Sequence, residues 1–68
     1  MKYVIYTEIW KDDNTTENWY YALCSTERKA NEVALELGNG NGVYHKVCTE
    51  KEIHQLNLNI KNLPASLL

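Results

Sequence analysis

The sequence predicts a small α+β domain in the order ββαβα. One helix packs on a three-stranded, mainly antiparallel sheet, and a short C-terminal helix is followed by a tail. Two β-type runs on either side of a polar stretch predict a hairpin at residues 2–24. An apolar stripe with helical spacing predicts a helix at residues 26–37, and a third β-type run predicts a strand at residues 43–48. Because the chain has 68 residues, we expect a single domain, residues 1–68.

The predicted hairpin holds six of the seven aromatic residues of the chain. Turn-forming residues from Lys11 to Glu17 join its two strands. Side chains alternate along a strand, so one face carries Tyr3, Ile5, Thr7 and Ile9, and the other carries Val4, Tyr6, Glu8 and Trp10. Both faces are largely apolar, and so small a chain has few elements to cover them. We expect Trp10 and Trp19, which flank the turn, to pair across the strands.

The helix at residues 26–37 has clear ends. Ser25 is a good N-cap, and Gly38 is a natural terminator. The apolar stripe consists of Ala30, Val33, Ala34 and Leu37. This stripe predicts that the helix covers one face of the sheet.

The second helix begins with a capping box, Thr49 at the N-cap and Glu52 at the third helical position. The spacing of Ile53, Leu56 and Ile60 fits a longer helix. The alternation of Leu56, Leu58 and Ile60 fits a strand or an extended tail instead. Asparagines alternate with them, and asparagine is a poor helix former. We therefore expect a short helix at residues 50–56 and an irregular tail at residues 57–68, in which Pro64 stops any helix.

Composition narrows the classes of partner. The net charge is −2, and the seven Lys and Arg residues form no run, which disfavours binding to nucleic acid. No apolar stretch approaches the length of a membrane span. The N-terminus lacks a secretory signal, so we expect a cytoplasmic protein in which Cys24 and Cys48 remain thiols.

Motifs for catalysis or for a metal are not evident. The soft or borderline metal ligands are Cys24, His45, Cys48 and His54, and they lack the paired spacings of zinc sites. The glycines follow the first helix and cannot direct N–H groups at a phosphate on a helix start. We predict no catalytic residue, no metal and no cofactor, and hence a non-enzymatic protein.

Residues Thr26–Leu37, followed by the stretch Gly42–Val47, resemble the corresponding part of small uncharacterised accessory proteins encoded by bacteriophages and prophages. In those proteins a short aromatic hairpin precedes such a helix and strand. The resemblance implies an accessory protein that acts inside a bacterial host cell, commonly by binding a host protein. It implies no functional residues.

The leading hypothesis is a small protein-binding module, an inhibitor or adaptor of a host protein that acts by steric occlusion. Aromatic residues are enriched at interfaces, so the predicted contact residues are Tyr6, Trp10, Tyr20 and Tyr44, with a polar rim of Asp12, Asp13 and Glu17. One alternative is a homo-oligomer, plausibly a homodimer, whose aromatic face or C-terminal leucines meet their own copies. Another is an oligomeric protein that sequesters a nucleotide between aromatic rings, although scarce Lys and Arg clusters disfavour a highly phosphorylated ligand.

Overall fold

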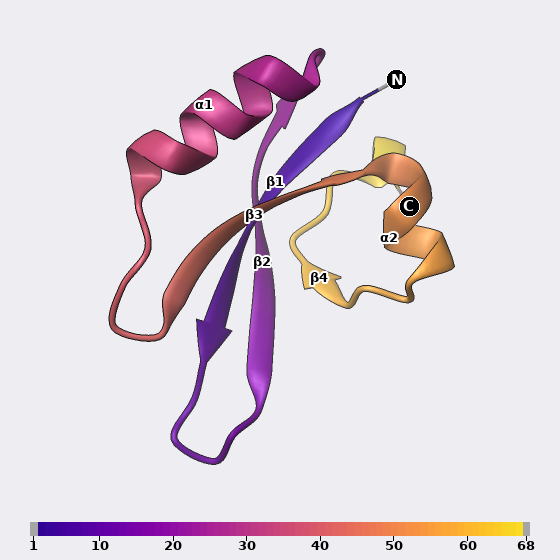
Figure 1. Cartoon of the computed structure of the whole chain (residues 1–68). Coiled ribbons are helices and arrows are strands. Elements are labelled where there is room, and N and C mark those ends of the chain that lie inside the picture. The colour runs from indigo at the N-terminus through magenta and orange to yellow at the C-terminus, as the bar shows by residue number, and fades with distance from the viewer. Residues whose placement is uncertain (1, 68) are drawn as a thin grey trace.

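The computed structural model describes residues 2–67 and confirms the α+β class (Figure 1). The strands are β1 (Tyr3–Trp10), β2 (Thr16–Cys24), β3 (Val43–Thr49) and β4 (Ile60–Lys61). The helices are α1 (Glu27–Leu37), α2 (Glu50–Gln55) and the 3-10 helix η1 (Ala65–Leu67). The predicted hairpin, first helix, third strand and second helix are all present, with ends that differ from the predictions by one or two residues.

The sheet has four strands in the order β3-β1-β2-β4, not the three that were predicted. β1 is central and antiparallel to both β2 and β3, whereas β4 runs parallel to β2. β4 pairs Ile60 with Asn18 and Lys61 with Trp19. The prediction of an irregular tail holds for residues 57–59 and 62–64 but is wrong for Ile60–Lys61, which form β4, and for the 3-10 turn Ala65–Leu67. In β4, Ile60 is buried and Lys61 is exposed, as the alternation of a strand requires.

α1 covers one face of the sheet. Its N-cap is Thr26 and not Ser25, because the Thr26 side chain accepts a hydrogen bond from the Lys29 N–H at 3.2 Å. Gly38 ends the helix with a φ of 76°, a left-handed conformation that glycine adopts without strain. α1 contacts β1, β2 and β3, and its Ala30 is fully buried.

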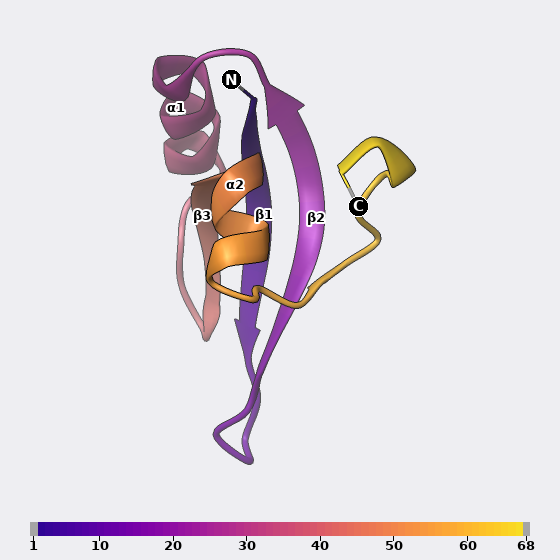
Figure 2. The ribbon, with the colours of Figure 1, turned by 90° about the vertical axis from the view of Figure 1, so that its right-hand side faces the viewer.

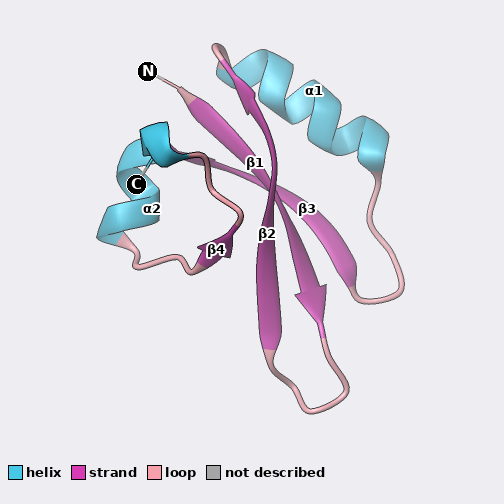
Figure 3. Ribbon diagram, turned by 180° about the vertical axis from the view of Figure 1, so that it is seen from behind, coloured by secondary structure: helices cyan, strands magenta, loops and turns pink. Residues whose placement is uncertain are grey.

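The opposite face of the sheet is covered by α2 and the C-terminal segment, which lie across the sheet from α1 in Figures 1 and 3. Val4, Tyr6 and Cys48 of the sheet form a core there with Ile53, Ile60 and Leu67. α2 begins with the predicted capping box, in which the side chains of Thr49 and Glu52 bond each other's backbone N–H groups. The tail is thus part of the core.

Neither α1 nor α2 with the C-terminal segment extends over the outer half of the hairpin. Its tip projects beyond α1, α2 and β4 in Figures 1 and 2. The principal extents of 35 × 25 × 17 Å describe a flat molecule. Its accessible surface of 4780 Å² exceeds the about 4,400 Å² expected for a folded monomer of this mass. Residues 10–16, at the tip, are all exposed to solvent.

The predicted cross-strand pair of tryptophans does not form. In the hairpin register Trp10 lies opposite Thr16, and Trp19 lies opposite Thr7. The two indoles therefore project from opposite faces of the sheet. The loop at residues 11–15 sets this register through backbone hydrogen bonds from Lys11 N–H to the Thr15 carbonyl at 2.9 Å and from Asn14 N–H to the Lys11 carbonyl at 3.1 Å.

We predict that Ile60→Ala lowers the free energy of unfolding by about 2 to 4 kcal/mol, because it opens a cavity beneath the tail. Urea denaturation followed by circular dichroism measures this loss. Leu56→Ala is the matched control, since Leu56 is 63% exposed, and it should change stability by less than about 0.5 kcal/mol. Equal stability of the two variants would show that the tail does not belong to the core.

Candidate functional site

Two predicted contact residues, Trp10 and Tyr44, line a shallow hollow of about 240 Å³ together with Glu8 and Lys46. We call these four residues the aromatic groove. Glu8 lies opposite Tyr44 in the β1–β3 ladder, and alternation places Trp10 and Lys46 on the same face. The same face of the sheet also carries Val4 and Tyr6, which are buried under α2 and the C-terminal segment. The groove therefore lies on the core face of the sheet, at the end that these elements do not cover. Trp10 is 51% exposed and Tyr44 is 39% exposed.

Glu8 fixes the position of the indole in the groove. Its Oε1 accepts a hydrogen bond from Trp10 Nε1 at 3.0 Å and lies 3.1 Å from Lys46 Nζ. The Trp10 backbone is also held, because its N–H donates to the Gly42 carbonyl at 2.7 Å. Gly42 has a φ of 78°, and an added Cβ would lie 3.3 Å from the Trp10 carbonyl oxygen. The exposed aromatic ring is therefore held in place by both its backbone and its side chain.

Tyr6 and Tyr20 do not belong to an open surface. Tyr6 is 7% exposed within the core, and the half-buried Tyr20 packs against that core. Burial raises the pKa of the Tyr6 hydroxyl. Ile60 and Leu67 of the tail contribute to this part of the core, and the sequence alone had left the tail irregular. The expectation that Tyr6 is free to contact a partner is corrected accordingly.

Asp12 and Asp13 lie in the exposed loop at the tip of the hairpin and do not line the groove. The Asp13 carboxylate accepts hydrogen bonds from the Thr15 side chain and, at 3.1 Å, from the Thr15 N–H. These bonds hold the pKa of Asp13 below its usual value. Asp13 thereby closes the turn and helps to set the register of the hairpin.

Glu17 belongs to β2 and not to the loop, and it lies opposite Ile9 on the face away from the groove. Its carboxylate bonds Trp19 Nε1 at 3.0 Å and Lys61 Nζ at 2.8 Å, and it pairs with Lys11. Hydrogen bonds from the two lysines lower its pKa to about 2. Lys61 Nζ also lies 5.2 Å from the centre of the Trp19 ring, a cation–π contact. Glu17 therefore ties β4 to the hairpin.

Sequence reasoning missed Glu8 and Lys46 as groove residues. A local signal was present, because the pattern Glu-x-Trp occurs at Glu8–Trp10 and again at Glu17–Trp19. In each case the indole N–H donates to the carboxylate two residues earlier at 3.0 Å. Residues two apart share a strand face, so the spacing predicts this bond. The lysine partners come from other strands and need the sheet register.

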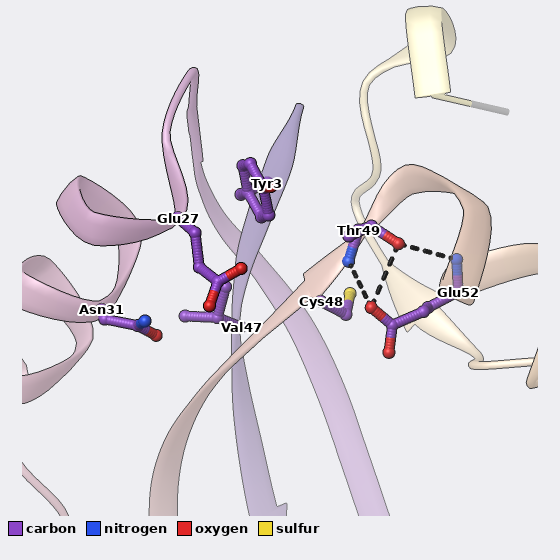
Figure 4. A pocket seen from close by; sticks show the side chains of 7 residues that line it. All are labelled: Tyr3, Glu27, Asn31, Val47, Cys48, Thr49 and Glu52. Atoms are coloured by element: carbon purple, nitrogen blue, oxygen red, sulfur yellow. Dashed lines mark hydrogen bonds between the residues drawn. The ribbon is translucent and has the colours of Figure 1, made fainter. Parts of the chain in front are cut away.

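A second hollow, of about 180 Å³, lies where α1 faces the junction of β3 and α2 (Figure 4). The Glu52 Oε1 at its rim bonds the Thr49 N–H and hydroxyl, both at 3.1 Å, as part of the capping box. Burial, followed by the nearby Glu52 charge, raises the pKa of the Cys48 thiol to about 11. The thiol is therefore protonated at neutral pH and packs as an apolar group.

Potential metal ligands do not converge in the part of the chain that the structure describes. Within residues 2–67, no three His, Cys, Asp or Glu side chains gather where they would hold a metal ion. His45 lies opposite Thr7 and Cys48 opposite Val4, so they point to opposite faces of the sheet. His45 Nδ1 donates to the Gly38 carbonyl at 2.6 Å and so links β3 to the end of α1. The helices of residues 2–67 are all too short or too polar to cross a membrane.

Comparison with family models, with curated proteins and with solved structures finds no match to this chain. Function is therefore inferred from the aromatic groove and from the surfaces around it.

We predict that Glu17 makes stability depend on acidic pH. Its pKa of about 2 in the folded protein lies below the usual 4.5, so its contribution is present above about pH 5 and is lost as the pH falls toward 2. Urea denaturation at several pH values should show that the wild type loses more stability over this range than Glu17→Gln. Glu36→Gln removes an exposed carboxylate of α1 and should follow the wild type. Parallel curves for Glu17→Gln and the wild type would contradict this role.

We also predict unequal thiol reactivity. In the native protein at pH 8, Ellman's reagent should modify the half-buried Cys24 quickly and the buried Cys48 slowly. Both should react in denaturant, and Cys24→Ser should leave almost no fast reaction. Equal native rates for the two thiols would show that Cys48 is not held in the core.

Proposed function

We propose that the protein is a small non-enzymatic binding module that contacts another protein through the aromatic groove. The observation that supports this proposal is the pair of exposed rings, Trp10 and Tyr44, held on rigid strands outside the core. Trp and Tyr are the residues most enriched at binding hot spots. A ring that is already fixed, as Trp10 is by Glu8, loses little conformational freedom on binding.

The shape of the molecule supports the same proposal. A typical stable interface buries about 800 Å² on each partner, roughly a sixth of the 4780 Å² that this chain exposes. The groove lies beside the hairpin tip, and the tip projects beyond α1, α2 and β4 in Figure 1. The exposed loop with Asp12 and Asp13 would form a polar rim beside the groove.

A binding module of this size acts by occlusion. It covers a surface of its partner and so excludes that partner's other ligands, or it brings the partner to a third molecule. The resemblance to phage accessory proteins favours a bacterial host protein as the partner. Lys46 is the one basic side chain of the groove, and its pairing with Glu8 disfavours a phosphorylated ligand there.

We predict that the double variant Trp10→Ala/Tyr44→Ser folds like the wild type but loses its partner, because both side chains lie outside the core. The variants are immobilised, exposed to bacterial lysate and compared by quantitative mass spectrometry. Leu35→Ser, at an 83% exposed position of α1, is the matched control and should retain the same protein.

Circular dichroism and thermal melting verify that each variant is folded. Retention of the same protein by the folded double variant would contradict the proposal. Sedimentation of the wild type at micromolar concentration tests the second candidate, a homodimer.

A further inference from the structure

β3 lies at one edge of the sheet, because the strand order is β3-β1-β2-β4. An edge strand presents a row of outward N–H and C=O groups, on which a strand of another chain can pair. The N–H groups of Val43 and His45 point away from β1, since both donate to the loop at residues 38–42, which we call the α1–β3 loop. Outward groups belong to alternate residues of an antiparallel strand, so those of Val47 point the same way.

The α1–β3 loop occupies the outward groups at one end of this edge. The Gly40 N–H donates to the Val43 carbonyl at 2.9 Å, and the Val43 N–H donates to the Gly40 carbonyl at 3.0 Å. The His45 N–H donates to the side-chain Oδ1 of Asn39 at 2.8 Å, and His45 Nδ1 lies 2.6 Å from the Gly38 carbonyl oxygen. The 2.8 Å distance is that of a sheet hydrogen bond. The Asn39 Oδ1 therefore lies where a carbonyl oxygen of an added strand would lie.

The rest of the edge fits a second copy of the same strand. Among residues 2–67, the outward groups of Val47 have no hydrogen-bond partner. If the His45 N–H were also free, His45 of each copy could lie opposite Val47 of the other in an antiparallel pair with two-fold symmetry. Each such pair would exchange both of its N–H···O=C bonds. Asn39 takes the His45 N–H out of both pairs and fills the space of the other strand's carbonyl.

The side chain at the centre of this pairing opposes it as well. Lys46 lies between His45 and Val47, so the two-fold axis would place Lys46 of one copy directly opposite Lys46 of the other. Like charges directly opposite each other destabilise a pair of strands, and lysine on an edge strand is a common protection against pairing. Lys46 is 49% exposed, so its ammonium group lies at the surface where the second copy would approach.

We propose that the α1–β3 loop protects the β3 edge and so prevents copies of this chain from pairing through β3. Asn39 is the main protecting residue, because its amide satisfies the His45 N–H with a single oxygen and offers no strand on which further pairing could build. Lys46 opposes the same pairing through its charge. Asn39 lies outside the aromatic groove, so this role is independent of the proposed function.

The test compares the wild type with Asn39→Ala by amide hydrogen exchange, followed by NMR. In dilute solution the His45 amide should exchange slowly in the wild type and about tenfold or more faster in the variant, because the variant lacks its acceptor. The Val47 amide should exchange quickly in both proteins. As the concentration of Asn39→Ala is raised, the Val47 amide should become protected, because it donates to His45 of the second copy.

Sedimentation velocity measures the association itself. Asn39→Ala should self-associate about tenfold or more tightly than the wild type, since each freed His45 N–H counts twice in a two-fold dimer. Asn39→Ala/Lys46→Thr should associate more tightly again, because it removes the like charges and introduces a residue that favours strands. Asn59→Ala, which removes an exposed asparagine far from β3, is the control and should behave as the wild type does. Circular dichroism verifies that each variant is folded.

Three results would overturn the inference. A wild-type dimer in which the Val47 amide is protected would show that the edge pairs in spite of the loop. Failure of both folded variants to associate at millimolar concentration would show that the loop is not what prevents pairing. Association of the variants that leaves the Val47 amide unprotected would assign the contact to another surface.

Discussion

Burial of the central strand on both of its faces is the constraint on which the rest of this structure depends. Val4 and Ile5 are adjacent in β1, project from opposite faces and are both fully buried. A strand of this kind needs a cover on each side. In a chain of 68 residues, α1 provides one cover, and α2 with the C-terminal segment provides the other. Both covers are short, and Trp10 at the end of β1 is left exposed.

In the outer half of the hairpin, hydrogen bonds and ion pairs hold the aromatic side chains in place of burial in the core. On each face a glutamate accepts an indole N–H from its own strand and pairs with a lysine from a neighbouring strand. The interactions of Glu8 with Trp10 and Lys46 fix the side chains of the aromatic groove. The interactions of Glu17 with Trp19 and Lys61 attach β4, and with it the tail, to the hairpin. These interactions keep large aromatic side chains ordered at a surface where no core fixes them, and ordered exposed rings suit a binding surface.

Local features of the fold were predictable from the sequence, and long-range features were not. The helix at residues 26–37 and the capping box of Thr49 and Glu52 were found because their signals lie within a few residues of each other. The tail was mispredicted because the pairing of β4 depends on β2, some forty residues earlier in the chain. In the candidate site, Trp10 and Tyr44 were correctly predicted to be exposed aromatic residues. Tyr6 was wrongly predicted to be exposed, because the sequence did not show that α2 and the C-terminal segment cover it.

The sequence by itself determined the hairpin, the third strand and the two α-helices, because periodicity, caps and turn residues act over at most a few positions. It also determined that both faces of the hairpin are apolar. Only the tertiary structure decided which part of each hairpin face is buried and which part is exposed to solvent. The hairpin register separated Trp10 from Trp19, and the ladder between β1 and β3 brought Tyr44 and Lys46 beside Trp10. Register depends on hydrogen bonds between segments far apart in the chain, and a shift of one residue moves every side chain to the other face.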